Sequence, residues 1–294
     1  MTKTKESRGI IILALGHPYW GRWAYNLAMS IKFTSPDARI TLLYAGDGKS
    51  QIGDTSFFDR MIEVAPKYYT TGGRIEYMKA KTALYKLTPY KETIYLDADT
   101  IWMNKKPIGQ LFDQLESVNF TMANRSWMDL ENQVIPEEFG VWASPAHIKD
   151  HFRFKEGRFY NLSSEMIYFK KDKKVGKLFS DAFDLWDAPI SHRQFNGGMP
   201  DELPFTISMI KNKIYPHEDN YKPFYWEAAS RPPQRLEGGD LQAFYAYSMG
   251  GHMAHPIMSK TYNNMVKFYC KQFSVMTPYL WIDKRSWMPG RSTL

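Results

Sequence analysis

The 294-residue sequence is poor in cysteine and has no long apolar run. Its one cysteine, Cys270, excludes an internal disulfide, which is typical of a protein from a reducing compartment. No stretch approaches the ~20 consecutive apolar residues that a membrane-spanning helix needs. Residues 9–16 form an apolar run of a strand's length, too short for the core of a secretory signal. We therefore expect a cytoplasmic protein, either soluble or peripheral to a membrane.

A glycine-rich phosphate loop is also missing after this first apolar run. Residues 16–21 read Gly-His-Pro-Tyr-Trp-Gly, with a proline and bulky aromatic side chains where backbone would have to approach a phosphate. This pattern disfavours a nucleotidyltransferase, which stays an alternative behind the function argued below. Internal repeats and low-complexity linkers are absent too, so the sequence predicts one main domain.

The composition that is present is that of an ordinary globular protein, with 44% hydrophobic and 23% charged residues. The 38 lysines and arginines outnumber the 31 aspartates and glutamates, which gives a net charge of +7. An excess of positive charge favours anionic ligands such as nucleotide phosphates, nucleic acid or acidic lipid.

Apolar periodicity predicts alternating strands and helices. A continuous apolar run at 9–15, helical spacing over 20–32 and a second apolar run at 40–45 predict a β-α-β unit with a right-handed crossover. Residues 124–162 lack a clear pattern and are expected to form loops over the site. Further strands are expected at 61–64, 92–96, 119–123 and 166–169, and further helices at 74–87, 106–115, 172–186, from 200, 239–248 and 261–276.

Two carboxylates follow the strand expected at residues 92–96. Asp97 and Asp99 would emerge at the carboxyl end of a buried strand, where open α/β sheets bind ligands. Carboxylate oxygens are hard ligands that suit Mg²⁺ or Mn²⁺ together with substrate phosphates. In the alternative interpretation the segment is a turn in which one aspartate caps the residues that follow.

The sequence around these carboxylates resembles a known family. Residues 78–102, which include Leu-Asp-Ala-Asp at 96–99, are similar to GT-A glycosyltransferases of the family 8 type, the glycogenin and bacterial galactosyltransferase group. Members of that group carry a Leu-Asp-x-Asp strand end. Residues 161–169 and the pair Asp201-Glu202 resemble later segments of the same family.

The resemblance implies a fold and an activity. The expected fold is a GT-A-like α/β/α sandwich around a mostly parallel twisted sheet with a Rossmann-like nucleotide-binding half. The expected glycosyltransferase domain covers residues 1–260, with a basic and aromatic helix and tail at 261–294 packed on it. The expected reaction moves a sugar from a nucleotide-diphosphate donor, a UDP-sugar first, to a glycan, protein, lipid or nucleic-acid acceptor, with retention favoured over inversion.

The family's donor site implies roles for five residues. Asp97 and Asp99 would hold Mn²⁺ or Mg²⁺ on the diphosphate, Asp99 as the firmer ligand and Asp97 also near the ribose. Lys79 and Lys81 would lie near the phosphates, although a solvated helix face is the commoner role for a lysine. Tyr19 would stack on the base or pack beneath the first helix. The family usually has an aspartate at the first strand's end, and its absence here leaves the base open.

The family's third metal ligand is a histidine in a C-terminal strand, followed by a glycine and then Lys-Pro-Trp. The resemblance places this ligand at His255 or His252, with Lys260 as the lysine that would contact the donor. Lys260 follows His255 by five residues, one fewer than in the family, and the Pro-Trp is missing. His255 is preferred, although a single histidine more often has a structural role.

Asp201 and Glu202 are the catalytic candidates that the resemblance implies, near the acceptor hydroxyl or the anomeric carbon. In an inverting enzyme a carboxylate would be the general base, whereas retaining relatives have no agreed base. In the alternative interpretation, two acids in the first turn of a helix simply complement its dipole. Glu165 and Asp240 are second-rank candidates.

The C-terminal residues 260–294 combine six lysines and arginines with one aspartate and seven aromatic residues. Such a segment suits an anionic lipid surface or single-stranded nucleic acid, with or without catalysis elsewhere in the chain. A non-enzymatic membrane- or nucleic-acid-binding protein is therefore an alternative function. The competing structural interpretation is an ordinary helix packed on the domain.

Overall fold

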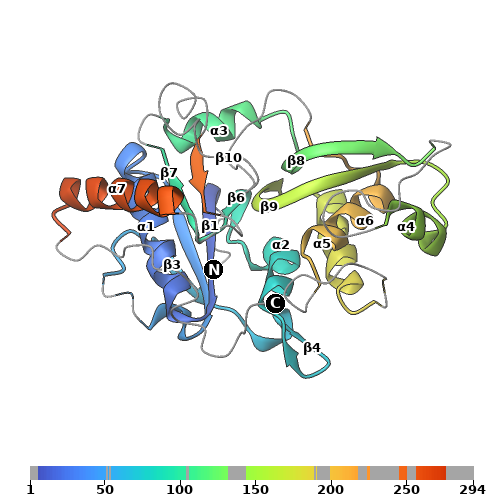
Figure 1. The fold of residues 1–294 in the computed structure, drawn as a ribbon, viewed down its shortest axis with the longest axis horizontal. Coiled ribbons are helices and arrows are strands. Elements are labelled where there is room, and N and C mark those ends of the chain that lie inside the picture. The colour runs from blue at the N-terminus through green and yellow to red at the C-terminus, as the bar shows by residue number, and fades with distance from the viewer. Residues whose placement is uncertain are drawn as a thin grey trace. The chain divides into compact units, whose positions relative to one another are not determined.

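The computed structural model describes residues 6–50, 52, 54–103, 106–131, 144–188, 190, 199–217, 224–225, 245–249 and 256–275 (Figure 1). Its largest sheet has six strands in the order β3-β2-β1-β6-β9-β8. The strands are β1 (Glu6–Gly16), β2 (Ile40–Gly46), β3 (Arg60–Glu63), β6 (Tyr90–Leu96), β8 (Phe120–Asp129) and β9 (Arg158–Lys170). The predicted α/β class, a mostly parallel sheet flanked by helices, is confirmed.

The predicted β-α-β unit is present at the start of the chain. β1 buries Ile10, Ile11 and Ile12 completely, as expected of a strand with both faces covered. His17 then caps α1 (Pro18–Thr34), because its side chain accepts a hydrogen bond from the backbone N–H of Tyr19. The proline at the first helical position has no N–H to leave unpaired and so favours the same start.

Contacts divide the chain into two compact units, which we describe separately. Unit 1 comprises residues 1–11, 63–95 and 115–221, and unit 2 comprises residues 12–62, 96–114 and 222–294. β1 contributes residues to both units, and the domain expected at 1–260 with its tail at 261–294 stays a prediction.

Unit 1 is built on the antiparallel pair β8 and β9, whose register shifts between Met122 and Ala123 and again between Asn124 and Ser126. Helices α5 (Lys173–Leu185) and α6 (Glu202–Asn212) pack on each other, and α6 also packs on β9. The unit further contains η2 (Pro66–Tyr68), β4 (Thr70–Thr71), β5 (Arg74–Ile75), the 3₁₀ helix η3 (Tyr77–Ala83), α2 (Leu84–Leu87) and α4 (Pro145–Phe152).

Two predictions for unit 1 were wrong in part. Residues 124–162 are not only loops, because β8 extends to Asp129, α4 follows Ser144, and β9 begins at Arg158. Met128, Ile148 and Phe159 belong to one buried cluster, but the residues between them show little regular apolar alternation, so the pattern did not indicate these elements. The helix expected at 74–87 is instead a short hairpin strand, η3 and the single turn α2.

Unit 2 packs α1 against the small sheet β10-β11-β7 and the helix α7 (Pro256–Gln272). The strands are β7 (Thr100–Trp102), β10 (Phe224–Tyr225) and β11 (Ala246–Ser248), and the unit also holds η1 (Asp47–Lys49) and α3 (Ile108–Gln114). The helix expected at 239–248 was wrong for residues 246–248, which form β11, and residues 239–244 lie outside the described part.

The expected C-terminal helix is confirmed as α7, and it packs within unit 2. Tyr262, Val266, Tyr269 and Cys270 are buried along one face of α7, which agrees with the interpretation of an ordinary packed helix. None of the described helices combines the length and the apolar composition needed to cross a membrane.

Candidate functional site

The Asp97–Asp99 segment is a turn held by its backbone. β6 ends at Leu96, and the N–H and hydroxyl of Thr100 both donate to the carbonyl of Asp97, at 3.2 Å and 2.8 Å. The N–H of Met249 donates to the carbonyl of Asp99 at 3.0 Å. The backbone of the turn is thus fixed at both aspartates.

The strand that follows the turn is anchored by polar groups inside unit 2. The backbone N–H of Trp102 donates to the Ser30 hydroxyl of α1 at 2.9 Å, and the Trp102 carbonyl accepts from the Tyr269 hydroxyl of α7 at 2.6 Å. Asn26 of α1 donates to the Tyr262 hydroxyl at 3.2 Å. These buried bonds connect α1, β7 and α7, so the position of the turn is set by the core of the unit.

The donor set of the turn fits a hard divalent cation. Asp99 is 8% exposed and Asp97 is partly exposed, so one carboxylate is buried beside one that solvent reaches. Carboxylate oxygens are the ligands that Mg²⁺ and Mn²⁺ prefer. Among the described residues no three His, Cys, Asp or Glu side chains gather into a complete metal site. His252 and His255, the candidates for a third ligand, lie outside the described residues, as does Asp240.

The ends of β1 and β2 form a second polar region of unit 2. The Tyr19 ring stacks on His17 with centroids 4.9 Å apart, and the Arg22 guanidinium lies 5.0 Å from the ring centre. Burial and, next, the charge of Arg22 lower the pKa of His17, whereas Asp47 acts in the opposite direction. A base would therefore have to share the Tyr19 ring with neighbours already packed on it.

Asp47, directly after β2, is a residue that the sequence interpretation missed. It begins η1, and it lies close enough to influence the His17 side chain. Gly48 packs against β1 so closely that a Cβ there would lie 1.8 Å from the Ala14 carbonyl oxygen. The Gly-Asp-Gly sequence at 46–48 was the available signal, because glycines beside an acid after a strand mark a close backbone approach.

Unit 1 contains a buried cluster around Asp201. The Lys81 ammonium lies 2.8 Å from Asp201 Oδ2 and donates to the Ser164 hydroxyl at 3.0 Å. The Ser164 hydroxyl lies 2.7 Å from the same Asp201 oxygen. Asp201 is 1% exposed. Three distant segments, η3, β9 and the start of α6, therefore supply one charged pair and the hydroxyl that joins it.

The protonation of this cluster follows from its contacts. Burial alone would raise the pKa of Asp201, but the charge and hydrogen bonds of Lys81, with further bonds from Glu202 and Ser164, hold it below its ordinary value. Burial and the neighbouring Asp201 carboxylate raise the pKa of Glu202 well above its ordinary value. The helix-dipole interpretation was therefore insufficient, since a buried lysine neutralises Asp201.

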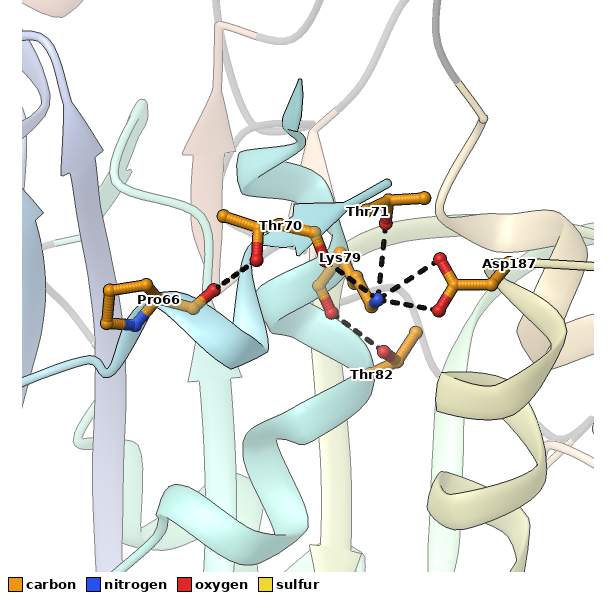
Figure 2. Close-up of polar contacts among 6 residues, drawn as sticks. All are labelled: Pro66, Thr70, Thr71, Lys79, Thr82 and Asp187. Atoms are coloured by element: carbon orange, nitrogen blue, oxygen red, sulfur yellow. Dashed lines mark hydrogen bonds and ion pairs between the residues drawn. The ribbon is translucent and has the colours of Figure 1, made fainter. Parts of the chain in front are cut away.

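Lys79 has a different set of partners (Figure 2). Its ammonium donates to the Thr70 carbonyl at 2.9 Å and to the Thr71 hydroxyl at 3.2 Å, and it lies 2.9 Å from the Asp187 carboxylate. These contacts connect η3 to β4 and to the turn that follows α5. The interpretation as a solvated helix face was wrong for both lysines, because Lys79 is 3% and Lys81 8% exposed.

Glu165 and Lys260 are the remaining candidates among the described residues. Glu165 is buried on β9 and accepts a hydrogen bond from the Ser163 hydroxyl at 2.9 Å. Lys260 is exposed on α7. The sequence interpretation gave no role to Ser164. Two adjacent serines and a glutamate in a buried strand were the available signal, because buried polar groups need hydrogen-bond partners.

Comparison with known proteins identifies the fold. No protein-family model matches the sequence, and no curated protein sequence matches it significantly. The apo structure of the bifunctional glycosyltransferase WbbM is 10% identical with a TM-score of 0.57, over 94% of this chain and 51% of that one. This chain thus spans about half the length of WbbM.

Two structures of the galactosyltransferase LgtC are similar over almost their whole length. The complex with donor and acceptor sugar analogues is 14% identical with a TM-score of 0.53, and an active-site mutant is 13% identical with a TM-score of 0.54. Each comparison covers 92% of this chain and 96% of LgtC. The chain has the GT-A-like fold of these glycosyltransferases.

Proposed function

We propose that this protein transfers a sugar from a nucleotide-diphosphate donor, a UDP-sugar first, to an acceptor hydroxyl, with Mn²⁺ or Mg²⁺. The observation that carries the proposal is the turn at Asp97 and Asp99, which follows a buried strand of a glycosyltransferase fold. Ligands of open α/β sheets bind beyond the carboxyl ends of the strands, which is where this turn lies.

The two aspartates would hold the metal through their carboxylates. A bound divalent cation supplies Lewis-acid stabilisation of the negative charge that develops on a departing diphosphate. The buried Asp99 would be the permanent ligand, and the more exposed Asp97 would also reach the ribose. Because backbone bonds fix the turn on both sides, these carboxylates need little reorganisation to bind.

Asp201 and Glu202 are the groups proposed to act on the sugars. Asp201 is held by Lys81 and Ser164, and Glu202 keeps part of its surface exposed. We propose that this acid pair acts at the acceptor hydroxyl or the anomeric carbon, and that transfer proceeds with retention. LgtC has been solved with donor and acceptor sugar analogues, so a glycan is the first acceptor to test.

The test is a thermal-shift screen of nucleoside diphosphates with and without Mn²⁺. A ligand that binds the folded state raises the melting temperature by mass action. We expect a shift for UDP that requires Mn²⁺ and that is lost in Asp99→Asn. Asp37→Asn, at an exposed turn of the same unit, is the matched control and should behave as wild type. No metal-dependent shift with any nucleotide would refute the proposal.

A further inference from the structure

The two carboxyl groups of the cluster in unit 1 share one hydroxyl group, that of Ser164. The Ser164 hydroxyl lies 2.7 Å from Asp201 and 3.3 Å from Glu202, and it accepts from Lys81 at 3.0 Å. A hydroxyl has one proton to donate, so it can satisfy only one of the two carboxyl groups fully. The shorter distance assigns this proton to Asp201, and Glu202 also has a hydrogen bond from the backbone.

The two carboxyl groups also contact each other. Both lie within hydrogen-bond distance of the Ser164 hydroxyl, and each carboxyl group shifts the pKa of the other. Charge favours a proton on one of the two groups, because within the described part of the chain a single ammonium, that of Lys81, faces two adjacent carboxyl groups that cannot both be ionised cheaply. One proton makes the three groups neutral together.

The position of Lys81 decides which carboxyl group holds the proton. Its ammonium lies 2.8 Å from Asp201 Oδ2, so the negative charge is stabilised on Asp201. Asp201 is 1% exposed, whereas Glu202 is partly exposed at the first position of α6. The proton therefore belongs on the more accessible group.

We propose that Glu202 takes part in glycosyl transfer as a neutral carboxylic acid, whose hydroxyl donates to Asp201 and whose carbonyl oxygen accepts a hydrogen bond from a sugar hydroxyl. In this role it orients the sugar and is neither the general base nor a nucleophile. The inference rests on the proposed function. It deepens that function because it assigns the sugar contact to Glu202 and makes Asp201, Ser164 and Lys81 the groups that position it.

Among the described residues, the polar groups around Glu202 come from the start of its own helix and from two other elements, of which one supplies a charge. Lys81 comes from η3 and Asp201 directly precedes α6, while β9 contributes the uncharged hydroxyl of Ser164. The raised pKa of Glu202 agrees with this arrangement. As pH rises, Glu202 should lose its proton well after ordinary glutamates have done so, and the hydrogen bond to Asp201 should be lost with it.

A titration of the intact protein tests the protonation directly. In a ¹³C-NMR titration of glutamate-labelled protein, we expect one carboxyl signal to titrate well above the rest and to vanish in Glu202→Gln. Glu156→Gln is the control, because Glu156 is exposed and paired with Lys213 in the same unit. If every glutamate signal titrates at ordinary pH, or the late signal survives in Glu202→Gln, the proposal is overturned.

Activity separates the neutral role from a base or nucleophile. The glutamine amide donates to Asp201 and presents a carbonyl oxygen, so Glu202→Gln should stay within about tenfold of wild type, a loss no larger than one hydrogen bond. The rate of transfer by wild type should fall at alkaline pH as Glu202 ionises, and Glu202→Gln should not show this fall. Transfer by Glu202→Ala should be slower than transfer by Glu202→Gln. A glutamine variant as inactive as the alanine variant would contradict the neutral role. Absence of transfer in wild type would refute the proposed function and leave the titration result intact.

Discussion

The two acid pairs of this protein are fixed in different ways. Asp97 and Asp99 of unit 2 lie in a turn whose hydrogen bonds involve their backbone carbonyls. Asp201 and Glu202 of unit 1 are instead defined by side chains, since Lys81 and Ser164 reach Asp201 from distant segments. In the first pair the backbone sets where the carboxylates are. In the second pair the neighbours set what charge they carry.

The largest expected effect concerns the first pair. Asp99→Asn should reduce transfer on the order of a thousandfold, because a metal ligand that stabilises the leaving diphosphate is lost. The folded state should change little, since the turn is held by backbone bonds that the substitution keeps. Steady-state kinetics with titrated Mn²⁺ measures the loss. If the rate of transfer falls as far in Asp37→Asn, or if Asp99→Asn stays active, the assignment of Asp97 and Asp99 as metal ligands fails.

Lys81→Met should have the next largest effect, and it acts on stability. Removal of one partner from a buried ion pair costs about 3–5 kcal/mol, because the remaining charge stays buried and unpaired. Urea unfolding measures the change. The double variant Lys81→Met with Asp201→Asn should recover part of it, since the stranded charge is removed. A double variant no more stable than the single one would show that Asp201 does not depend on Lys81.

The pH dependence of stability should separate the two members of the second pair. The raised pKa of Glu202 means that the folded state holds its proton more tightly, so this contribution is present at low pH and declines as pH rises toward the folded pKa. The contribution of Asp201 has the opposite pH dependence. Because its pKa is lowered in the folded state, this stabilisation is present at neutral pH and is lost only in acid.

Glu202→Gln isolates the first of these contributions. Relative to wild type, it should gain stability as pH rises above the ordinary pKa of a glutamate, by ~1.4 kcal/mol for each unit by which the pKa of the wild-type carboxyl is raised. Urea unfolding at several pH values gives the slope. A constant difference between the two proteins across these pH values would contradict a shifted Glu202.

The smallest effect is expected for the ion pair of Lys79 with Asp187. Asp187→Asn should lower the free energy of unfolding by under about 1 kcal/mol. The Asp187 side chain is 51% exposed, and Lys79 keeps the Thr70 carbonyl and the Thr71 hydroxyl as partners. Thermal unfolding compared with the exposed-site variant Glu156→Gln measures it. A loss as large as that of Lys81→Met would show that the two lysines are equivalent in role, against their different surroundings.

Sequence patterns predicted the parts of the fold with strong local signals. The continuous apolar run of β1, the helical spacing of α1 and the capped helix α5 all appear where they were expected. The elements that failed have weak local signals. β11 is three residues long, and the outer half of β8 lacks a regular apolar alternation, so only their strand partners define them.

The sequence by itself determined that two carboxylates follow a buried strand, because both the strand and the turn are set by residues close along the chain. It also placed Asp201 and Glu202 at the start of a helix. Only the tertiary structure decided that Lys81 neutralises Asp201 and that Ser164 joins the two acids. In the sequence, Lys81 is 120 residues and Ser164 is 37 residues away from Asp201. The physical reason is that charge and protonation depend on distance in space, which a local pattern of residues does not record.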